Sequence, residues 1–333
     1  MQATATHATS LVACAILILL SLVAVAVAVP LGRKRPIALI TGGTRGIGSG
    51  IATALAEEGY DLLLTYNTDR SAADAFAKRL STAHGTDGPR VECVGGDISL
   101  CATRDAIFEK LDAMLAESGG RDGEEGRRLA VLVHNAGQWA GVTSENSEGI
   151  EGSSSMKAFG DGSLIDDNGR ADLAVMHYYQ RMYGEAFIDL SERSLLRMGD
   201  AEDGGGSIIG ISNPGVCAHL YRPDSHYSLN GAGKSLIEYS ARIYAGQVAG
   251  RGINVNVIAP GITETTAWDC LAKGRGMDSG KQLIQGMVER RVPLKKAVTP
   301  MDIGNLVKFL CSDSGKFLTG SVLPCDGGLH LKI

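Results

Sequence analysis

The stretch Thr41-Gly42-Gly43-Thr44-Arg45-Gly46-Ile47-Gly48 decides the fold, because it lies between an apolar strand and a helix. We predict the strand over 36–40 and the helix over about 47–58, with Ile51, Leu55 and Ala56 on one helix face. Glycine at such a turn permits a positive φ and lets an anion approach the backbone N–H groups. Because the helix N-terminus would face that anion, the stretch predicts a cradle for the phosphates of a nucleotide.

Strands and helices alternate along the rest of the chain. Further strands are predicted over 61–66, 91–94, 129–133, 207–211, 254–258 and 321–323. Further helices are predicted over 72–80, 103–117, 173–196, 231–249 and 301–310. This rhythm is typical of an α/β fold with a Rossmann-type, doubly wound, seven-stranded parallel sheet, in which ligands bind at the carboxyl ends of the strands. We expect a single domain of this kind over residues 36–333.

Two segments interrupt the alternation, 118–128 and 138–170, and both are rich in Gly, Ser, Asp and Glu. Loops of this length are uncommon inside a compact domain, so we predict surface insertions and, for the first, disorder. The second segment leaves the sheet beside the predicted nucleotide site, which keeps a role as a lid open.

The N-terminus carries a candidate membrane segment. Residues 11–29 are apolar except for Ser21, which is enough to cross a hydrocarbon layer of about 30 Å as a helix. Residues 1–10 contain no Lys or Arg, whereas Arg33-Lys34-Arg35 follow the apolar run. We therefore predict that residues 1–35 are a transmembrane signal-anchor that leaves the following domain in the cytosol. The alternative is a leader whose removal gives a soluble protein.

The composition of the chain excludes some classes of partner and ligand. The chain of 333 residues has 32 basic and 37 acidic residues, a formal net charge of −5, and no basic stripe with interleaved aromatic residues, so nucleic acid is excluded as a partner. Its seven cysteines form no CxxC pair and no metal-ligand spacing. We predict no metal site, and we interpret the cysteines as buried free thiols in a reducing compartment.

Several further motifs follow the glycine-rich stretch in a fixed order: Gly96-Asp97-Ile98, His134-Asn135-Ala136-Gly137, Pro260-Gly261-Ile262-Thr263-Glu264-Thr265, Thr319-Gly320 and Asp326-Gly327-Gly328. Together they resemble the short-chain dehydrogenase/reductase family over residues 36–331, and the reductases of 3-oxoacyl thioesters in particular. The resemblance implies that the motif at 96–98 holds the adenine ring, that the motif at 134–137 follows the fourth strand, and that the motif at 260–265 contacts the nicotinamide. The last two motifs, at 319–320 and 326–328, form the C-terminal ending. The resemblance also implies a homodimer or homotetramer.

Charge at the end of the second strand favours NADP(H) over NADH. The strand ends in Thr65-Tyr66-Asn67-Thr68 with no acid for a ribose hydroxyl, while Arg45 and Arg70 can reach a phosphate. The residues predicted to bind this cofactor are Thr41, Gly42, Thr44, Arg45, Gly46, Ile47, Gly48, Asn67, Arg70, Asp97, Ile98, Asn135, Ala136, Gly137, Tyr227, Lys234, Pro260, Gly261, Ile262, Thr263 and Thr265.

The catalytic positions depart from the pattern that the resemblance implies, which is a tyrosine, a lysine one helical turn later, a serine and an asparagine. Tyr227 matches the tyrosine, but Gly231 stands where the lysine is expected. Lys234 lies on nearly the same helix face and about 4.5 Å farther along the axis, so we predict that it replaces the lysine and lowers the pKa of Tyr227. The polarising group is Ser212 or, after a shift of one residue, Asn213. The asparagine has no clear counterpart.

Two functions remain open at this level. The first is an NADPH-dependent oxidoreductase that reduces a small-molecule ketone or 3-oxoacyl carbonyl by hydride transfer, with Tyr227 as proton donor. The second is a catalytically degenerate NADP(H)-binding scaffold or sensor, which the altered lysine, serine and asparagine positions would suit. For the reductase we expect the segment 266–291 to form a loop that covers the substrate.

Overall fold

The fold is taken from a computed structural model of the chain. It describes residues 35–83, 85, 88–116, 127–138, 165, 168–171, 173–217, 220–222, 228–274 and 277–331. The chain divides into two units after Lys34, and every element below belongs to the second, Arg35–Ile333. The two predicted insertions lie almost wholly outside the described residues, as does Tyr227.

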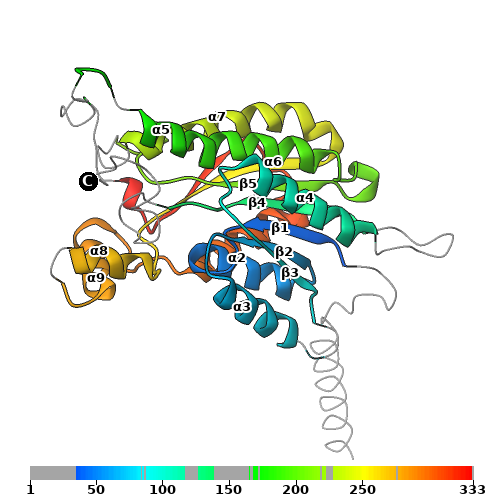
Figure 1. Cartoon of the computed structure of the whole chain (residues 1–333), viewed down its shortest axis with the longest axis horizontal. Coiled ribbons are helices and arrows are strands. Elements are labelled where there is room, and N and C mark those ends of the chain that lie inside the picture. The colour runs from blue at the N-terminus through cyan, green and yellow to red at the C-terminus, as the bar shows by residue number, and fades with distance from the viewer. Residues whose placement is uncertain are drawn as a thin grey trace, which may run out of the picture. The chain divides into compact units, whose positions relative to one another are not determined.

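Seven parallel strands form one sheet in the order β3-β2-β1-β4-β5-β6-β7 (Figure 1). They are β1 (Ile37–Thr41), β2 (Asp61–Tyr66), β3 (Val91–Gly95), β4 (Leu129–His134), β5 (Gly206–Ile211), β6 (Ile253–Pro260) and β7 (Val322–Cys325). The direction of winding reverses between β1 and β4, where such sheets open a crevice for ligands. The predicted seven-stranded, doubly wound sheet is confirmed.

Helices cover both faces of the sheet (Figure 1). On one face lie α4 (Cys101–Ala116), α5 (Ala174–Tyr179), α6 (Ala186–Leu195) and α7 (Ser228–Val248). On the other lie α2 (Gly46–Glu57), α3 (Arg70–Thr82) and α10 (Pro300–Leu310). Neighbouring residues of β1 point to opposite cores, since Leu39 packs in the first and Ile40 in the second. Burial on both faces explains why the strands are almost uniformly apolar.

Short helices complete the chain. They are the 3-10 turns η3 (Ala201–Asp203), η5 (Ala249–Arg251), η6 (Asp313–Gly315) and η7 (Leu329–Leu331), and the helices α8 (Ala267–Gly274) and α9 (Gly280–Arg291). The prediction of a loop over 266–291 is therefore wrong, because that segment contains α8 and α9. Gly280 and Gly286 lower the helix propensity of α9, so propensity alone does not predict this helix. The burial of Leu283, Ile284 and Val288 stabilises α9 instead.

The helix predicted over 173–196 is interrupted. Between α5 and α6 the backbone forms a π-helical turn, η2 (Gln180–Glu185). Here the chain passes very close to α7, since a Cβ on Gly184 would lie 2.4 Å from Leu236 Cδ2, and one on Gly233 would lie 2.6 Å from the Tyr179 carbonyl oxygen. Such π-turns often occur at functional sites.

The predicted fold class is wrong in one part, its membrane-spanning helix. Among the residues that the structure describes, none of the helices is long and apolar enough to cross a membrane. Even α7, with 21 residues, carries Lys234, Glu238 and Arg242, and charged side chains are costly in hydrocarbon. The segment 11–29 itself lies outside the described residues.

The cysteines of the described residues match the prediction in part. Cys93, Cys101, Cys217, Cys311 and Cys325 are free thiols. Cys217 is buried as expected, but Cys101 is exposed, because it begins α4 at the edge of the sheet.

Candidate active site

The glycine-rich loop joins β1 to α2 as predicted. Gly42 and Gly46 have φ values of +62° and +53°, which side chains other than glycine rarely adopt. The first turn of α2 contains no acidic residue, and Arg45 at its N-cap makes no capping bond with its side chain. A Cβ on Gly48 would lie 2.0 Å from the Gly42 carbonyl oxygen. The loop is thus a close-packed cradle with a positive helix end, which fits a pyrophosphate.

The residues that follow β4 hold this loop in place. The Asn135 side-chain amide donates to the carbonyl oxygens of Thr41 and Gly42, both at 3.1 Å. The Thr41 hydroxyl oxygen accepts from the backbone N–H groups of Asn135 at 3.0 Å and Ala136 at 2.9 Å. Asn135 is one of the predicted cofactor residues, and its side-chain amide positions the cradle.

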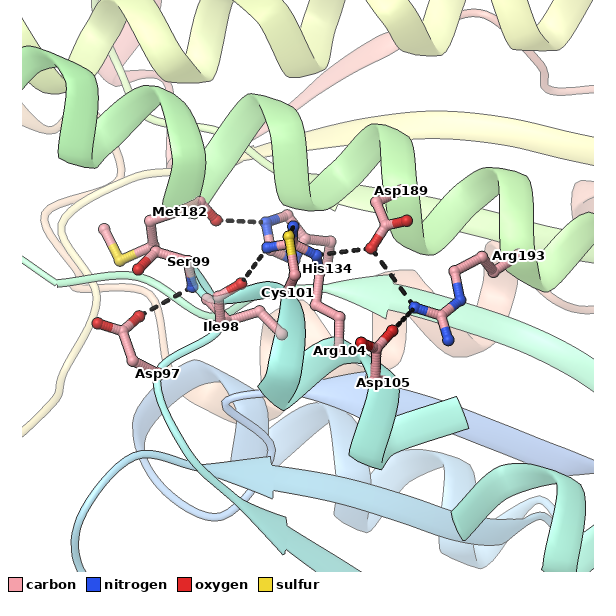
Figure 2. A network of polar contacts seen from close by, with 10 residues as sticks. All are labelled: Asp97, Ile98, Ser99, Cys101, Arg104, Asp105, His134, Met182, Asp189 and Arg193. Carbon is pink, nitrogen blue, oxygen red and sulfur yellow. Dashed lines mark hydrogen bonds and ion pairs between the residues drawn. The ribbon is translucent and has the colours of Figure 1, made fainter. Parts of the chain in front are cut away.

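His134 completes the same junction. Its Nε2 lies 3.1 Å from the Met182 carbonyl oxygen, which only accepts, so Nε2 carries the proton (Figure 2). Nδ1 then accepts from the Thr41 hydroxyl at 3.0 Å. Burial, with a smaller effect of the charge of Lys234, lowers the pKa of His134 to about 3, so the ring is neutral. Sequence analysis noted His134 only as part of a motif. Its position at the end of a buried strand was the available signal.

The predicted adenine-side residues follow β3. Asp97 accepts from the Ser99 N–H at 2.8 Å and from the Tyr178 hydroxyl at 3.2 Å, which links β3 to α5. The Ile98 carbonyl oxygen accepts from Arg104, whose Nε pairs with Asp189 at 2.6 Å (Figure 2). These bonds fix the segment that follows β3, at the carboxyl edge of the sheet.

The residues beyond β2 bear on the choice between NADP(H) and NADH. The nearest acid, Asp69, caps α3 by accepting from the Ala72 N–H at 2.9 Å. Its carboxylate is therefore engaged, and Asn67 is half-buried beside it in the chain. Arg45 is exposed. Arg70 pairs with Asp74 at 3.5 Å, with side chains 80% and 62% exposed, which is a weak ion pair that a phosphate can displace.

Lys234 lies deep in the protein at the carboxyl end of β5. Its side chain is 3% exposed, and its Nζ donates to the Ile211 carbonyl oxygen at 2.6 Å. The ammonium also lies 3.9 Å from the centroid of the Tyr183 ring. Burial lowers the pKa of Lys234 to about 7, although the Glu238 carboxylate acts in the opposite direction.

Glu238 and Ser212 form a second buried pair next to this lysine. The Ser212 hydroxyl, fully buried, donates to Glu238 Oε1 at 2.5 Å. Burial raises the pKa of Glu238, while hydrogen bonds from Ser212 and Cys217 and the charge of Lys234 lower it in part. Sequence analysis missed Glu238. The signal was its position four residues after Lys234, on the same face of α7.

Tyr183 is a further residue that sequence analysis did not select. It is buried, it stacks on Tyr179 with 5.6 Å between ring centroids, and its hydroxyl donates to the Gln138 carbonyl oxygen at 2.9 Å. The π-turn η2 brings this ring over the Lys234 ammonium. In the segment where the predicted asparagine was absent, the structure thus has an aromatic face.

Tyr227 lies outside the described residues, and α7 begins one residue after it, at Ser228. One helical turn before Lys234 is Asn230, which is 4% exposed. Within the described part of the chain, its side-chain oxygen is buried without a hydrogen-bond partner. Asn213, the alternative polarising group, is half-buried just beyond β5.

The segment after β6 closes the site from the other side. The Gly261 N–H donates to the Cys325 carbonyl oxygen at 2.9 Å, and the Thr263 hydroxyl donates to the Gly261 carbonyl oxygen at 3.0 Å. A Cβ on Gly46 would lie 3.5 Å from the Thr265 methyl group, so this segment reaches the glycine-rich loop. The predicted cofactor segments therefore converge on one edge of the sheet.

A pocket opens beside these strand ends. Pro214 and Gly215 line it from the β5 side, and Gly261 and Ile262 line it from the β6 side. Trp268 of α8 and Met287 of α9 form its outer wall. The pocket therefore lies beside the segment after β6 that is predicted to contact the nicotinamide.

A doubly wound sheet with a glycine-rich phosphate cradle at its switch point defines a dinucleotide-binding α/β protein. The family models "short chain dehydrogenase" and "Enoyl-(Acyl carrier protein) reductase" match residues 36–155 and 185–330, respectively. The chain belongs to the short-chain dehydrogenase/reductase family, and the resemblance inferred from the sequence is confirmed.

Individual relatives agree with this assignment. The chain is 28% identical over 299 residues to the 3-oxoacyl-[acyl-carrier-protein] reductase FabG of Staphylococcus aureus, covering 88% of this chain and 98% of the relative. The angucycline C-6 ketoreductase LanV with bound NADP is similar at 25% identity and a TM-score of 0.67, covering 89% of this chain and 96% of LanV. L-Sorbose reductase from Gluconobacter frateurii, complexed with NADPH and L-sorbose, shares the fold with a TM-score of 0.65 at 24% identity, over 91% and 99% of the two chains.

Proposed function

We propose that this chain is an NADPH-dependent reductase that converts a ketone or 3-oxoacyl-type carbonyl to an alcohol. The observation that carries the proposal is the Lys234 ammonium, which is buried at the end of β5 and hydrogen-bonded to Ile211 at 2.6 Å. The family assignment and the NADP named with the ketoreductase LanV support the same reading. The predicted homodimer or homotetramer remains a prediction.

One set of residues in this chain would bind the phosphates of the cofactor, and another would contact its nicotinamide. The N–H groups at the start of α2 would bind the pyrophosphate, and Arg45 and Arg70 would bind the 2′-phosphate. Pro260, Gly261, Ile262, Thr263 and Thr265 would contact the nicotinamide. When bound, NADPH supplies the hydride that reaches the carbonyl carbon.

The protein's own part in the reaction is to place a proton. Tyr227 would donate its hydroxyl proton to the carbonyl oxygen as the hydride reaches the carbon, which leaves a tyrosinate that solvent reprotonates. A nearby ammonium favours tyrosinate over tyrosine, which is the role assigned to Lys234. Ser212 or Asn213 would polarise the carbonyl oxygen. Because Ser212 is already bonded to Glu238, Asn213 is the more accessible donor.

The alternative, a cofactor-binding scaffold without turnover, is favoured by one observation. The residue one helical turn before Lys234 is Asn230, whose amide group has no acid strength at neutral pH. If Tyr227 does not reach the carbonyl, this arrangement would bind NADPH without supplying a proton.

The test is an assay of the purified full chain with NADPH and a panel of ketones and 3-oxoacyl thioesters. We expect oxidation of NADPH, and a fall in kcat/KM by about 10²–10⁴-fold in Tyr227→Phe, the range for loss of a general acid. Tyr239→Phe is the matched control, since this tyrosine also belongs to α7 but is 64% exposed. Tight NADPH binding without turnover of any panel member would favour the scaffold.

A further inference from the structure

The pocket beside β5 and β6 has a charge pattern that the proposed reaction does not require. Arg222 and Arg291 both line it, and His330 lines it from the C-terminal segment. None of its described lining residues is an aspartate or a glutamate. We propose that this pocket is an anion subsite, so that the substrate carries a carboxylate or phosphate group in addition to its carbonyl. This inference rests on the proposed reductase function for the identity of the carbonyl.

A buried carboxylate beneath the pocket fixes the position of His330. Asp326 is 4% exposed, and His330 Nδ1 lies 3.0 Å from its Oδ1. Asp326 also accepts from the backbone N–H groups of Gly328 and His330, at 2.9 Å and 2.8 Å. Since Nδ1 is held by this carboxylate, Nε2 is the other ring nitrogen, and it can donate to an anion only when the ring carries both protons, so the anion is assigned to the two arginines. The hydrogen bonds lower the pKa of Asp326 despite its burial, which keeps it charged.

The same carboxylate anchors the arginine at the pocket's rim. The Tyr221 hydroxyl donates to Asp326 Oδ2 at 2.7 Å, and its ring packs edge-on against His330 with 6.0 Å between centroids. Arg222 is the next residue and is exposed. Tyr221 therefore holds the backbone from which the Arg222 guanidinium extends, and an arginine so placed binds carboxylates and phosphates through two parallel hydrogen bonds.

Part of the pocket lining is apolar. Ile262, Trp268, Met287 and Leu329 line it, and the Trp268 indole N–H donates to the Thr263 carbonyl oxygen at 2.7 Å, which fixes the ring. Thr263 belongs to the segment predicted to contact the nicotinamide. The geometry therefore suits a molecule whose carbonyl lies toward β5 and β6, whose chain packs on Trp268, and whose anionic end meets Arg222 and Arg291.

The test uses three ketones that differ only at the far end: 5-oxohexanoate, 5-oxohexyl phosphate and methyl 5-oxohexanoate. We expect the full chain to reduce at least one anion with a kcat/KM about tenfold above that of the neutral ester, the effect of one charge-assisted hydrogen bond. Arg222→Met and Arg291→Met should remove that preference, so that each variant reduces the anions and the ester with equal kcat/KM. The anion preferred, carboxylate or phosphate, identifies the group.

Arg290→Met is the matched control, because Arg290 neighbours Arg291 on α9 and does not line the pocket. Equal kcat/KM for the ester and both anions would overturn the subsite while the reductase proposal stands. If no ketone is reduced, calorimetry with hexanoate and hexyl phosphate decides the subsite separately. Binding that Arg222→Met abolishes would support it, and binding of neither probe, or binding unaffected by Arg222→Met, would overturn it.

Discussion

The two halves of the site edge are built by different means. Around β1 to β4, the cofactor cradle consists of backbone and glycines, with Asn135 and Thr41 tying the loop together through main-chain bonds. Around β5 and α7, the site consists of buried side chains, in which Lys234 and Glu238 of α7 meet the segment that ends β5, at Ile211 and Ser212. A cradle made of backbone requires glycine at the positions where a side chain would not fit. A cluster of buried side chains can keep the same arrangement of charges when one of its residues is replaced.

The strongest challenge to this comparison is Lys234→Met. Met fills a similar volume without the charge, so we expect kcat/KM for ketone reduction to fall by about 10²–10⁴-fold, since the tyrosine pKa would no longer be lowered. The measurement is steady-state oxidation of NADPH. Lys316→Met, at an exposed site, should behave like the parent protein. Full activity in Lys234→Met would show that the β5 half does not depend on this charge.

The second prediction concerns the cradle. In Gly48→Ala the new Cβ would meet the Gly42 carbonyl oxygen at 2.0 Å, so the loop must shift. Overpacking of this kind costs about 1–3 kcal/mol, and we expect the Kd for NADPH to rise about tenfold to a hundredfold. Fluorescence titration with NADPH measures it.

Gly246→Ala provides the control for this substitution. Gly246 lies inside α7, and a Cβ there meets nothing within 4 Å. Alanine favours the helix by about 1 kcal/mol relative to glycine, so stability should be equal or higher and the Kd for NADPH unchanged. If Gly48→Ala bound NADPH as tightly as Gly246→Ala, the close packing assigned to the cradle would be wrong.

The third and smallest effect is a pH dependence of stability. The folded pKa of Lys234 is about 7, below its unfolded value, so above pH 7 the unfolded chain binds the extra proton and stability rises with pH. Between pH 7 and 8.5 this contributes about 1–2 kcal/mol, or about tenfold in the folding equilibrium, and the gain continues toward the unfolded pKa.

Urea denaturation at both pH values measures this contribution as the difference between the parent protein and Lys234→Met, which lacks the titrating group. We expect the parent to gain stability relative to the variant as pH rises. Parallel pH profiles would indicate that Lys234 does not titrate in this range.

Sequence reasoning served the two halves unequally. The glycine-rich loop and the seven strands follow from local apolar runs and turn residues, and they were predicted within a few residues, whereas the order of the strands in the sheet was not part of the prediction. The π-turn η2 was not predicted, because the apolar pattern of the sequence is that of a regular helix. The turn lies where α7 comes very close to Gly184, which is a tertiary contact that the sequence does not show. Helices α8 and α9 were missed because their stability comes from tertiary burial more than from propensity.

By itself, the sequence determined the family, the doubly wound sheet and the phosphate cradle, because each depends on residues adjacent in the chain. Only the tertiary structure decided the surroundings of Lys234. Its contacts with Ile211, Tyr183 and Glu238 join β5, η2 and α7, and the cost of burying a charge depends on all of them at once. The same holds for the pocket, where Arg222, Arg291 and His330 lie far apart in the sequence and meet only because the sheet brings their segments to one edge.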